Sequence, residues 1–189
     1  MSIVAFGRTG TNTVHRKTTL YIDIDDTIIA EVLPRSVRDL RPCVITHLTV
    51  LAQLYDCCWL TSWPWSPDDA PPGAMCVQTL MRGLYAHRIN ETFRYADWDR
   101  DHPGGKAGFV LDSNQPEDWY WLEDPIPMGE RDALTAAGKL DRYIPVYPEG
   151  AWGFLDAVNE LFLRTGITRA DFDRVGAHPE WFNRDALLA

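Results

Sequence analysis

Two carboxylates, Asp23 and Asp25, follow a short apolar run and are separated by one residue. In an extended chain such side chains project toward the same side. Carboxylates held close together repel one another unless a cation lies between them, and Mg²⁺ prefers oxygen ligands of this kind. A second acidic pair, Glu123 and Asp124, follows the apolar run of residues 119–122. The two pairs together predict a site for a hard divalent cation.

The elements that must position these side chains alternate between strands and helices. Apolar runs typical of buried strands end in reactive side chains at three places: Asp23, Thr61 and the pair Glu123-Asp124. This order predicts repeated β-α units, and therefore a Rossmann-like three-layer α/β/α sandwich with a mainly parallel sheet. In such sheets ligands bind at the carboxyl ends of the strands. The three groups are expected to meet at that edge.

The individual elements are predicted from apolar periodicity and from turn residues. Strands are expected at residues 20–22, 57–60, 93–95, 119–122 and 143–146, and helices at residues 42–54, 74–87, 106–112, 152–164 and 169–175. Residues 63–73 and 97–105 are expected to be loops, because prolines and glycines are frequent there.

The chain has 189 residues, which corresponds to one domain. Residues 1–18 are expected to be a flexible lead-in or an edge strand, residues 19–164 the folded domain, and residues 165–189 a helical tail. No apolar run is long enough for a transmembrane helix, and none of signal-peptide type precedes residues 15–17. We therefore expect a cytoplasmic protein with no membrane partner.

Composition narrows the classes of partner. Eighteen basic and 27 acidic residues give a net charge of −9, which argues against binding of extended duplex nucleic acid through a basic face. The apolar fraction of 46% excludes an intrinsically disordered chain. The cysteines, Cys43, Cys57, Cys58 and Cys76, form no Cys-x-x-Cys pair and are expected to be reduced and buried.

The order of the motifs resembles that of the haloacid dehalogenase (HAD)-like superfamily of phosphohydrolases. The first motif of that superfamily is an apolar strand followed by Asp-x-Asp-x-Thr, which residues 21–27 match. A strand ending in Thr or Ser, a lysine, and a strand ending in two acids then follow in the same order, at Thr61-Ser62, Lys106 and Glu123-Asp124. The resemblance implies that residues 19–164 form a HAD-like catalytic domain.

The resemblance also implies a Mg²⁺-dependent phosphatase that hydrolyses phosphomonoesters through an aspartyl-phosphate. Asp23 would be the nucleophile, and Asp25 the general acid and base. Mg²⁺ would be bound by Asp23, the main-chain carbonyl of Asp25 and Asp124, with Glu123 beside the metal. Many members of the superfamily have two Asp residues in the last motif, so Glu123 is a departure that leaves open which acid contacts the metal.

The same resemblance assigns phosphate binding to Thr27, Thr61 and Lys106, with Ser62 as the alternative to Thr61. Lys106 would balance charge on the nucleophile and on the phosphate. The alternative is that Lys106, like most lysines, is a solvated surface group. Lys106 is preferred here because it precedes the last acidic motif by a stretch that accommodates one helix and a turn.

The spacing of the motifs limits what can cover the site. There are 33 residues between Thr27 and Thr61, and 44 between Thr61 and Lys106, so neither interval holds a full cap domain. By resemblance, members without a cap often act on large substrates or take a lid from another subunit. We therefore expect a phosphorylated substrate, namely a nucleotide, a nucleic-acid end or a phosphoprotein, and an oligomer is compatible with the sequence.

Trp63 and Trp65 follow Thr61 closely. They would either stack on a nucleobase or pack beneath their loop and make it rigid, and packing is the favoured interpretation. The alternative function for the chain is a catalytically weak nucleotide- or protein-binding regulatory protein on the same fold. Glu123, the tryptophan-rich loop and the missing cap motivate that alternative.

Overall fold

The computed structural model describes residues 17–32, 37–40, 44–69, 76–83, 87–147 and 153–175. The predicted lead-in or edge strand before residue 17, the first residues of the predicted helix 42–54, and the end of the predicted tail lie outside the described residues. No helix in the described part of the chain is both long enough and apolar enough to cross a lipid bilayer.

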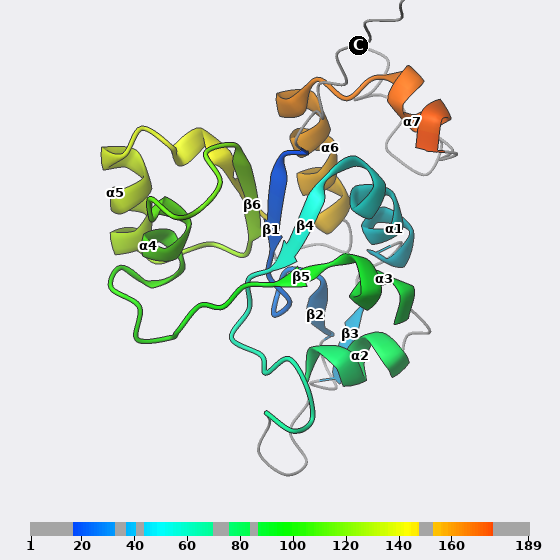
Figure 1. Ribbon diagram of the computed structural model, residues 1–189, viewed down its shortest axis with the longest axis horizontal. Helices are drawn as coiled ribbons and strands as arrows, with labels where there is room; N and C mark the ends of the chain where they lie inside the picture. Colours follow the sequence, from blue (N-terminus) through cyan, green and yellow to red (C-terminus); the bar gives the residue numbers. More distant parts are fainter. Residues whose placement is uncertain are drawn as a thin grey trace, which may run out of the picture.

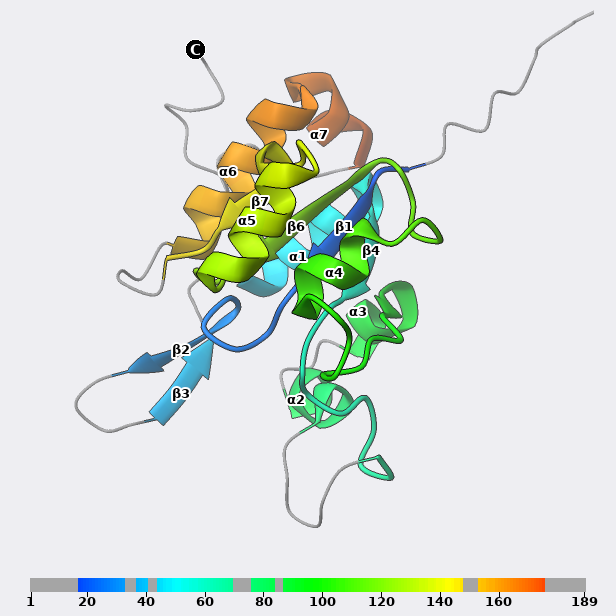
Figure 2. The same ribbon diagram turned by 90° about the vertical axis from the view of Figure 1, so that its left-hand side faces the viewer.

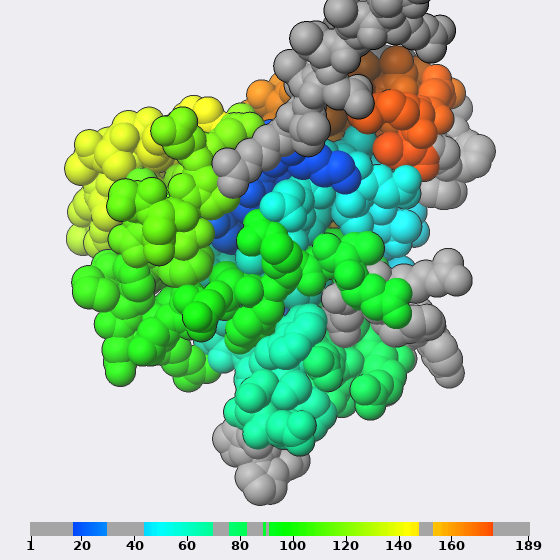
Figure 3. Space-filling view, in the orientation of Figure 1, coloured from blue at the N-terminus to red at the C-terminus, as the bar shows by residue number. Residues whose placement is uncertain are grey.

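Five parallel strands form the central sheet, in the order β5-β4-β1-β6-β7 (Figures 1 and 2). Their bounds are Thr19–Ile22 for β1, Asp56–Trp59 for β4, Arg94–Tyr95 for β5, Trp119–Glu123 for β6 and Tyr143–Pro145 for β7. The predicted parallel sheet is confirmed, and each predicted strand lies within one residue of the observed bounds. In the space-filling view, only a narrow band of β1 (blue) is visible between its neighbours (Figure 3).

The side chains of the central strand alternate between two hydrophobic cores. Leu20 and Ile22 lie in one core, and Tyr21 lies in the other. Strands β4 and β6 divide their side chains between the two cores in the same way. A strand buried on both faces has a continuous apolar sequence rather than an alternating one, which explains the short apolar runs.

Helices cover both faces of the sheet and complete a Rossmann-like α/β/α arrangement (Figures 1 and 2). One face is covered by α1 (Val44–Leu54), α6 (Gly153–Thr165) and α7 (Arg169–Val175), and the other by α4 (Gly105–Leu111) and α5 (Met128–Ala136). Two short helices, α2 (Val77–Gly83) and α3 (His87–Thr92), follow β4, and α3 contacts α1. A 3₁₀ turn at Leu140–Arg142 precedes β7.

The structure corrects the sequence expectations in three places. The expected helix at 74–87 is two helices, α2 and α3, and α2 ends at Gly83, a poor helix former. Strands β2 (Ile29–Val32) and β3 (Val37–Leu40) form an antiparallel hairpin outside the main sheet (Figure 2), without the Asn-Gly or Asp-Gly turn that signals one. Helix α5 was not expected, because Leu134 is its one buried residue and no apolar stripe is present.

The beginning of the predicted C-terminal tail packs on the main body. Phe172 of α7 is buried, and its ring centroid is 5.3 Å from that of Phe162 in α6. The cysteine prediction also holds for the described residues, since Cys57, Cys58 and Cys76 are buried and form no disulfide.

The packing of α5 gives a test of the second core. Leu134 is fully buried there, so Leu134→Ala should lower the free energy of unfolding by about 2–5 kcal/mol through lost burial and a cavity. Urea denaturation measures the change. The matched control is Leu163→Ala in α6, where the side chain is 58% exposed and the change should stay within about 0.5 kcal/mol. Equal effects of the two substitutions would contradict this packing.

Candidate active site

Strand register brings the two acidic motifs together at the carboxyl edge of the sheet. Ile22 of β1 is opposite Trp59 of β4 on one side and Leu122 of β6 on the other. The residues that come next, Asp23 after β1 and Glu123 at the end of β6, are therefore neighbours. The Asp23 amide donates a hydrogen bond to the Leu122 carbonyl at 3.0 Å, which continues the ladder past the end of β1.

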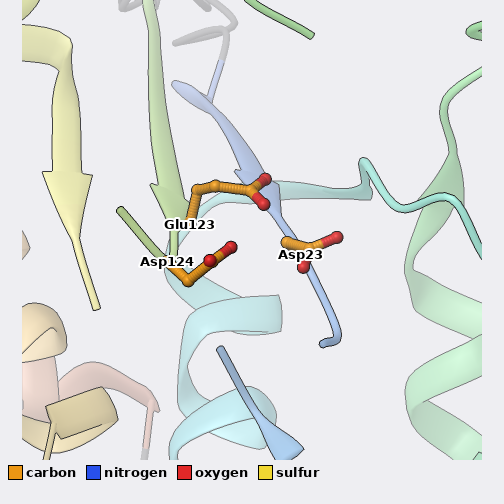
Figure 4. Close-up of side chains that lie close together, drawn as sticks. All are labelled: Asp23, Glu123 and Asp124. Atoms are coloured by element: carbon orange, nitrogen blue, oxygen red, sulfur yellow. The ribbon is translucent and has the colours of Figure 1, made fainter. Parts of the chain in front are cut away.

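Three carboxylates gather at this edge. Asp23, Glu123 and Asp124 each offer one oxygen, and these oxygens lie within 4.8 Å of one another. Glu123 and Asp124 extend from the end of β6 toward Asp23 (Figure 4). Asp23 and Glu123 are only 3% and 6% exposed, so little water is available to screen the repulsion among the three carboxylates.

Lys106 of α4 lies between the first two of these acids. Its ammonium donates to Asp23 Oδ1 at 2.7 Å and to Glu123 Oε1 and Oε2 at 2.8 and 2.7 Å. Glu123 Oε2 also accepts a hydrogen bond from the Trp121 indole N–H at 3.1 Å. Glu123 is thus bound to the lysine through both of its oxygens.

The start of α4 explains how the lysine reaches this position. Gly104 and Gly105 have φ values of 81° and 65°, a region that favours glycine. A Cβ on Gly105 would lie 2.9 Å from a Glu130 carboxylate oxygen. That carboxylate accepts a hydrogen bond from the Ala107 amide at 2.8 Å, in the first turn of α4. The glycines therefore turn the chain into α4 and leave room for the acid that stabilises its first turn.

The charges at the site do not balance. Three carboxylates around one ammonium leave two excess negative charges when all are ionised. Burial raises the pKa of Asp23 against the attraction of Lys106. Burial, followed by the negative charge of Asp23, raises the pKa of Glu123 well above its usual value. Burial also opposes charge on Lys106, but attraction to the two acids outweighs it and raises the lysine pKa.

The second acid of the first motif has a partner from the loop after β4. The Trp63 indole N–H donates to Asp25 Oδ2 at 2.6 Å. Trp63 and Trp65 are half-buried and pack against the first core, as the packing interpretation of this loop predicts. The Trp65 ring also packs on Tyr95, with centroids 5.4 Å apart.

Residues that follow β5 hold the loop that contains the predicted phosphate-binding Thr61 and Ser62. The Trp98 indole N–H donates to the Thr61 carbonyl at 2.9 Å, and Arg100 donates to the Ser62 carbonyl at 2.8 Å. The Trp98 ring centroid is also 6.0 Å from the Lys106 ammonium, within the range of a cation–π contact. Trp98 thus links the Thr61 loop to the lysine.

The hydroxyls of the two predicted threonines accept hydrogen bonds from backbone amides. Thr27 is fully buried and accepts from the Asp124 amide at 3.0 Å, so it ties the turn after β1 to the end of β6. Thr61 is 1% exposed and accepts from the Trp63 amide at 3.2 Å. Their predicted phosphate contacts stay predictions.

Two residues that contact the site, Trp121 and Glu130, were not expected there from the sequence. Trp63 and Trp98 were expected near the site, but not the hydrogen bonds that their N–H groups donate. The three indoles carried a general signal, because a buried tryptophan N–H usually finds an acceptor. Which acceptor each indole finds depends on the path of the loops. Glu130 carried no signal, since nothing in the sequence relates it to α4.

The acidic cluster predicts binding of Mg²⁺. Three hard oxygen donors from neighbouring carboxylates suit this cation. Mg²⁺ should therefore raise the midpoint of thermal unfolding of the wild type. Asp124→Asn should weaken Mg²⁺ affinity, measured by calorimetric titration, by about tenfold or more. The control is Asp132→Asn, an exposed acid of α5, which should leave the affinity unchanged. A wild-type midpoint unaffected by Mg²⁺ would contradict the prediction.

Comparison with known proteins adds no relative from which roles could be transferred. No protein-family model matches the chain, and no curated protein matches its sequence. The residues of the site and their positions therefore carry the functional interpretation.

Proposed function

We propose that this protein is a Mg²⁺-dependent phosphomonoesterase of the HAD-like type, with Asp23 as its nucleophile. The observation that carries the proposal is the partly buried ammonium of Lys106, 2.7 Å from Asp23 and in contact with Glu123. The ammonium orients the Asp23 carboxylate and supplies positive charge where a phosphoryl group would accumulate negative charge. The carboxylates of Asp23, Glu123 and Asp124 outnumber this one ammonium, and they are oxygen ligands of the kind that a divalent cation would bind at the same place.

The residues at the strand ends suit Mg²⁺. Asp23, the main-chain carbonyl of Asp25 and Asp124 would hold it. Because both oxygens of Glu123 contact Lys106, we assign Glu123 to the lysine and Asp124 to the metal. When bound, the cation supplies charge that offsets the negative charge of the transferring phosphoryl group.

The assignment of the two neighbouring acids has its own test. Glu123→Gln retains an oxygen that can accept from Lys106, whereas Asp124→Asn removes a charged ligand of the cation. We expect Asp124→Asn to weaken Mg²⁺ affinity at least about threefold more than Glu123→Gln, by calorimetric titration of both variants. The reverse order would assign the direct metal contact to Glu123.

In the first step a carboxylate oxygen of Asp23 attacks phosphorus, and an O–P bond forms as the bond to the leaving oxygen breaks. Asp25 gives its proton to that leaving oxygen. Lys106 stabilises the negative charge that spreads over the phosphoryl oxygens. The products of this step are an alcohol and an aspartyl-phosphate at Asp23.

In the second step water attacks the phosphorus of the aspartyl-phosphate. Asp25, now ionised, takes a proton from that water, and the bond between phosphorus and the Asp23 oxygen breaks. Inorganic phosphate leaves, the Asp23 carboxylate is restored, and Asp25 is protonated again. The proton removed in the second step replaces the one given in the first.

The substrate class that we propose is the phosphomonoester, on a nucleotide, a nucleic-acid end or a phosphoprotein. This breadth follows from the expectation that no full cap domain covers the site. In the described residues, the interval between β1 and α1 contains the β2–β3 hairpin, and the interval between β4 and β5 contains the short helices α2 and α3. Hydrolysis of mononucleotides, 3′- or 5′-phosphorylated oligonucleotides and phosphopeptides under the same conditions separates the three substrates.

The nucleophile is tested with p-nitrophenyl phosphate. The wild type should hydrolyse it with Mg²⁺ and lose this activity with a chelator. Asp23→Asn should lower kcat by at least about a thousandfold, because amide nitrogen and oxygen are poor nucleophiles. Asp132→Asn, the exposed control, should retain wild-type kcat, and circular dichroism should show both variants folded.

Two results would count against the proposal. Retained turnover in Asp23→Asn would exclude Asp23 as the nucleophile. Mg²⁺ and nucleotide binding by the wild type, with no hydrolysis of any ester in the panel, would favour the regulatory binding protein instead.

A further inference from the structure

The contact between Trp63 and Asp25 is short and joins two loops 38 residues apart in the sequence. The indole N–H donates to Asp25 Oδ2 at 2.6 Å, which is shorter than the usual N–H···O hydrogen bond. Asp25 belongs to the turn after β1, and Trp63 to the loop after β4. The contact fixes one carboxylate oxygen of Asp25, and therefore the orientation of its side chain.

Trp63 is itself held in place at three points. Its carbonyl accepts a hydrogen bond from the Tyr95 hydroxyl at 2.5 Å, and its amide donates to the Thr61 hydroxyl at 3.2 Å. Its ring packs against the first hydrophobic core. The next two carbonyls, those of Pro64 and Trp65, accept from amides at the start of α2 at 3.0 and 3.1 Å. The donor that reaches Asp25 is therefore held by contacts with α2, with Tyr95 and with the first hydrophobic core.

We propose that Trp63 is a positioning residue for proton transfer, which fixes the Asp25 carboxyl so that it delivers its proton to the leaving oxygen. This inference rests on the proposed function and extends it to a residue outside the motifs. A carboxyl that rotates freely spends less time in line with the leaving oxygen. The indole N–H holds one oxygen and so restricts this rotation.

The contribution of Trp63 to the rate of hydrolysis should depend on the leaving group of the ester. Proton donation matters most when the departing oxygen is strongly basic, and little when it leaves as a stable anion. Loss of the Trp63 N–H should therefore slow the hydrolysis of esters with strongly basic leaving phenolates more than that of esters with weakly basic ones. Loss of packing alone would slow all esters alike.

The experiment compares phenyl phosphate, p-chlorophenyl phosphate and p-nitrophenyl phosphate, three esters of similar shape whose leaving phenolates decrease in basicity in that order. The variant is Trp63→Phe, which retains an aromatic ring and removes the N–H. Its kcat/KM for phenyl phosphate should fall about tenfold further than its kcat/KM for p-nitrophenyl phosphate, within the range that general acid catalysis supplies. The ratio kcat/KM is used because it reports the step in which the phenolate leaves.

Trp65→Phe is the matched control, since Trp65 lies in the same loop and its ring packs on Tyr95. It should preserve the wild-type ratio between the esters. Asp25→Asn should show the same dependence on the leaving group as Trp63→Phe, and the double variant should add little to it. Equal losses for all three esters in Trp63→Phe would overturn the inference.

A second readout does not depend on turnover. The indole N–H signal of Trp63, identified by its disappearance from the ¹⁵N–¹H spectrum of Trp63→Phe, should move in Asp25→Asn, because this substitution changes the group that accepts from the indole. An unmoved signal would show that the contact is absent in solution and would overturn the inference. If the signal moves in Asp25→Asn but the wild type hydrolyses none of the esters, the contact is present in solution. The proposed function, and with it the role of Trp63 in proton transfer, is then rejected.

Discussion

The ion pair of Lys106 with Asp23 and Glu123 is the interaction on which the rest of the site depends. Two carboxylates, one at the end of β6 and one just after β1, are almost fully buried, and a buried charge without a partner is strongly destabilising. The ammonium arrives from α4, whose start requires two glycines with positive φ. The edge of the sheet, the turn into α4 and the position of Asp23 therefore depend on one another.

Three indole N–H groups donate to polar groups in and around this ion pair. Trp121 donates to Glu123, Trp63 to Asp25, and Trp98 to the carbonyl of Thr61. Each ring is anchored in or against a hydrophobic core while its N–H reaches a polar group at the sheet edge. A large side chain with one donor suits this task, because apolar burial holds the ring and the single hydrogen bond sets a direction. Three of the eight tryptophans of the chain therefore hold polar groups of the site in place.

The sequence predicted what depends on local pattern. The central strand was recognisable because residues 20–22 are buried on both faces and the run stops at Asp23. The meeting of Asp23 with the two acids at the end of β6 followed from the common edge of parallel strands. The hairpin β2–β3 and the contact between Trp63 and Asp25 were not predictable in this way, because each depends on how a loop is folded back. The assignment of Glu123 to Lys106 needed the geometry of three oxygen–nitrogen distances.

The most direct test of the account is chemical trapping of the intermediate. The protein is mixed with a phosphomonoester and Mg²⁺, quenched, and treated with borohydride, which reduces an acyl phosphate to an alcohol. Peptide mass spectrometry then locates the modified side chain. We expect reduction at Asp23, dependent on both the ester and Mg²⁺ and absent from Asp23→Asn. Steady turnover with an unmodified Asp23, or modification of Asp25 or Asp124 in its place, would contradict it.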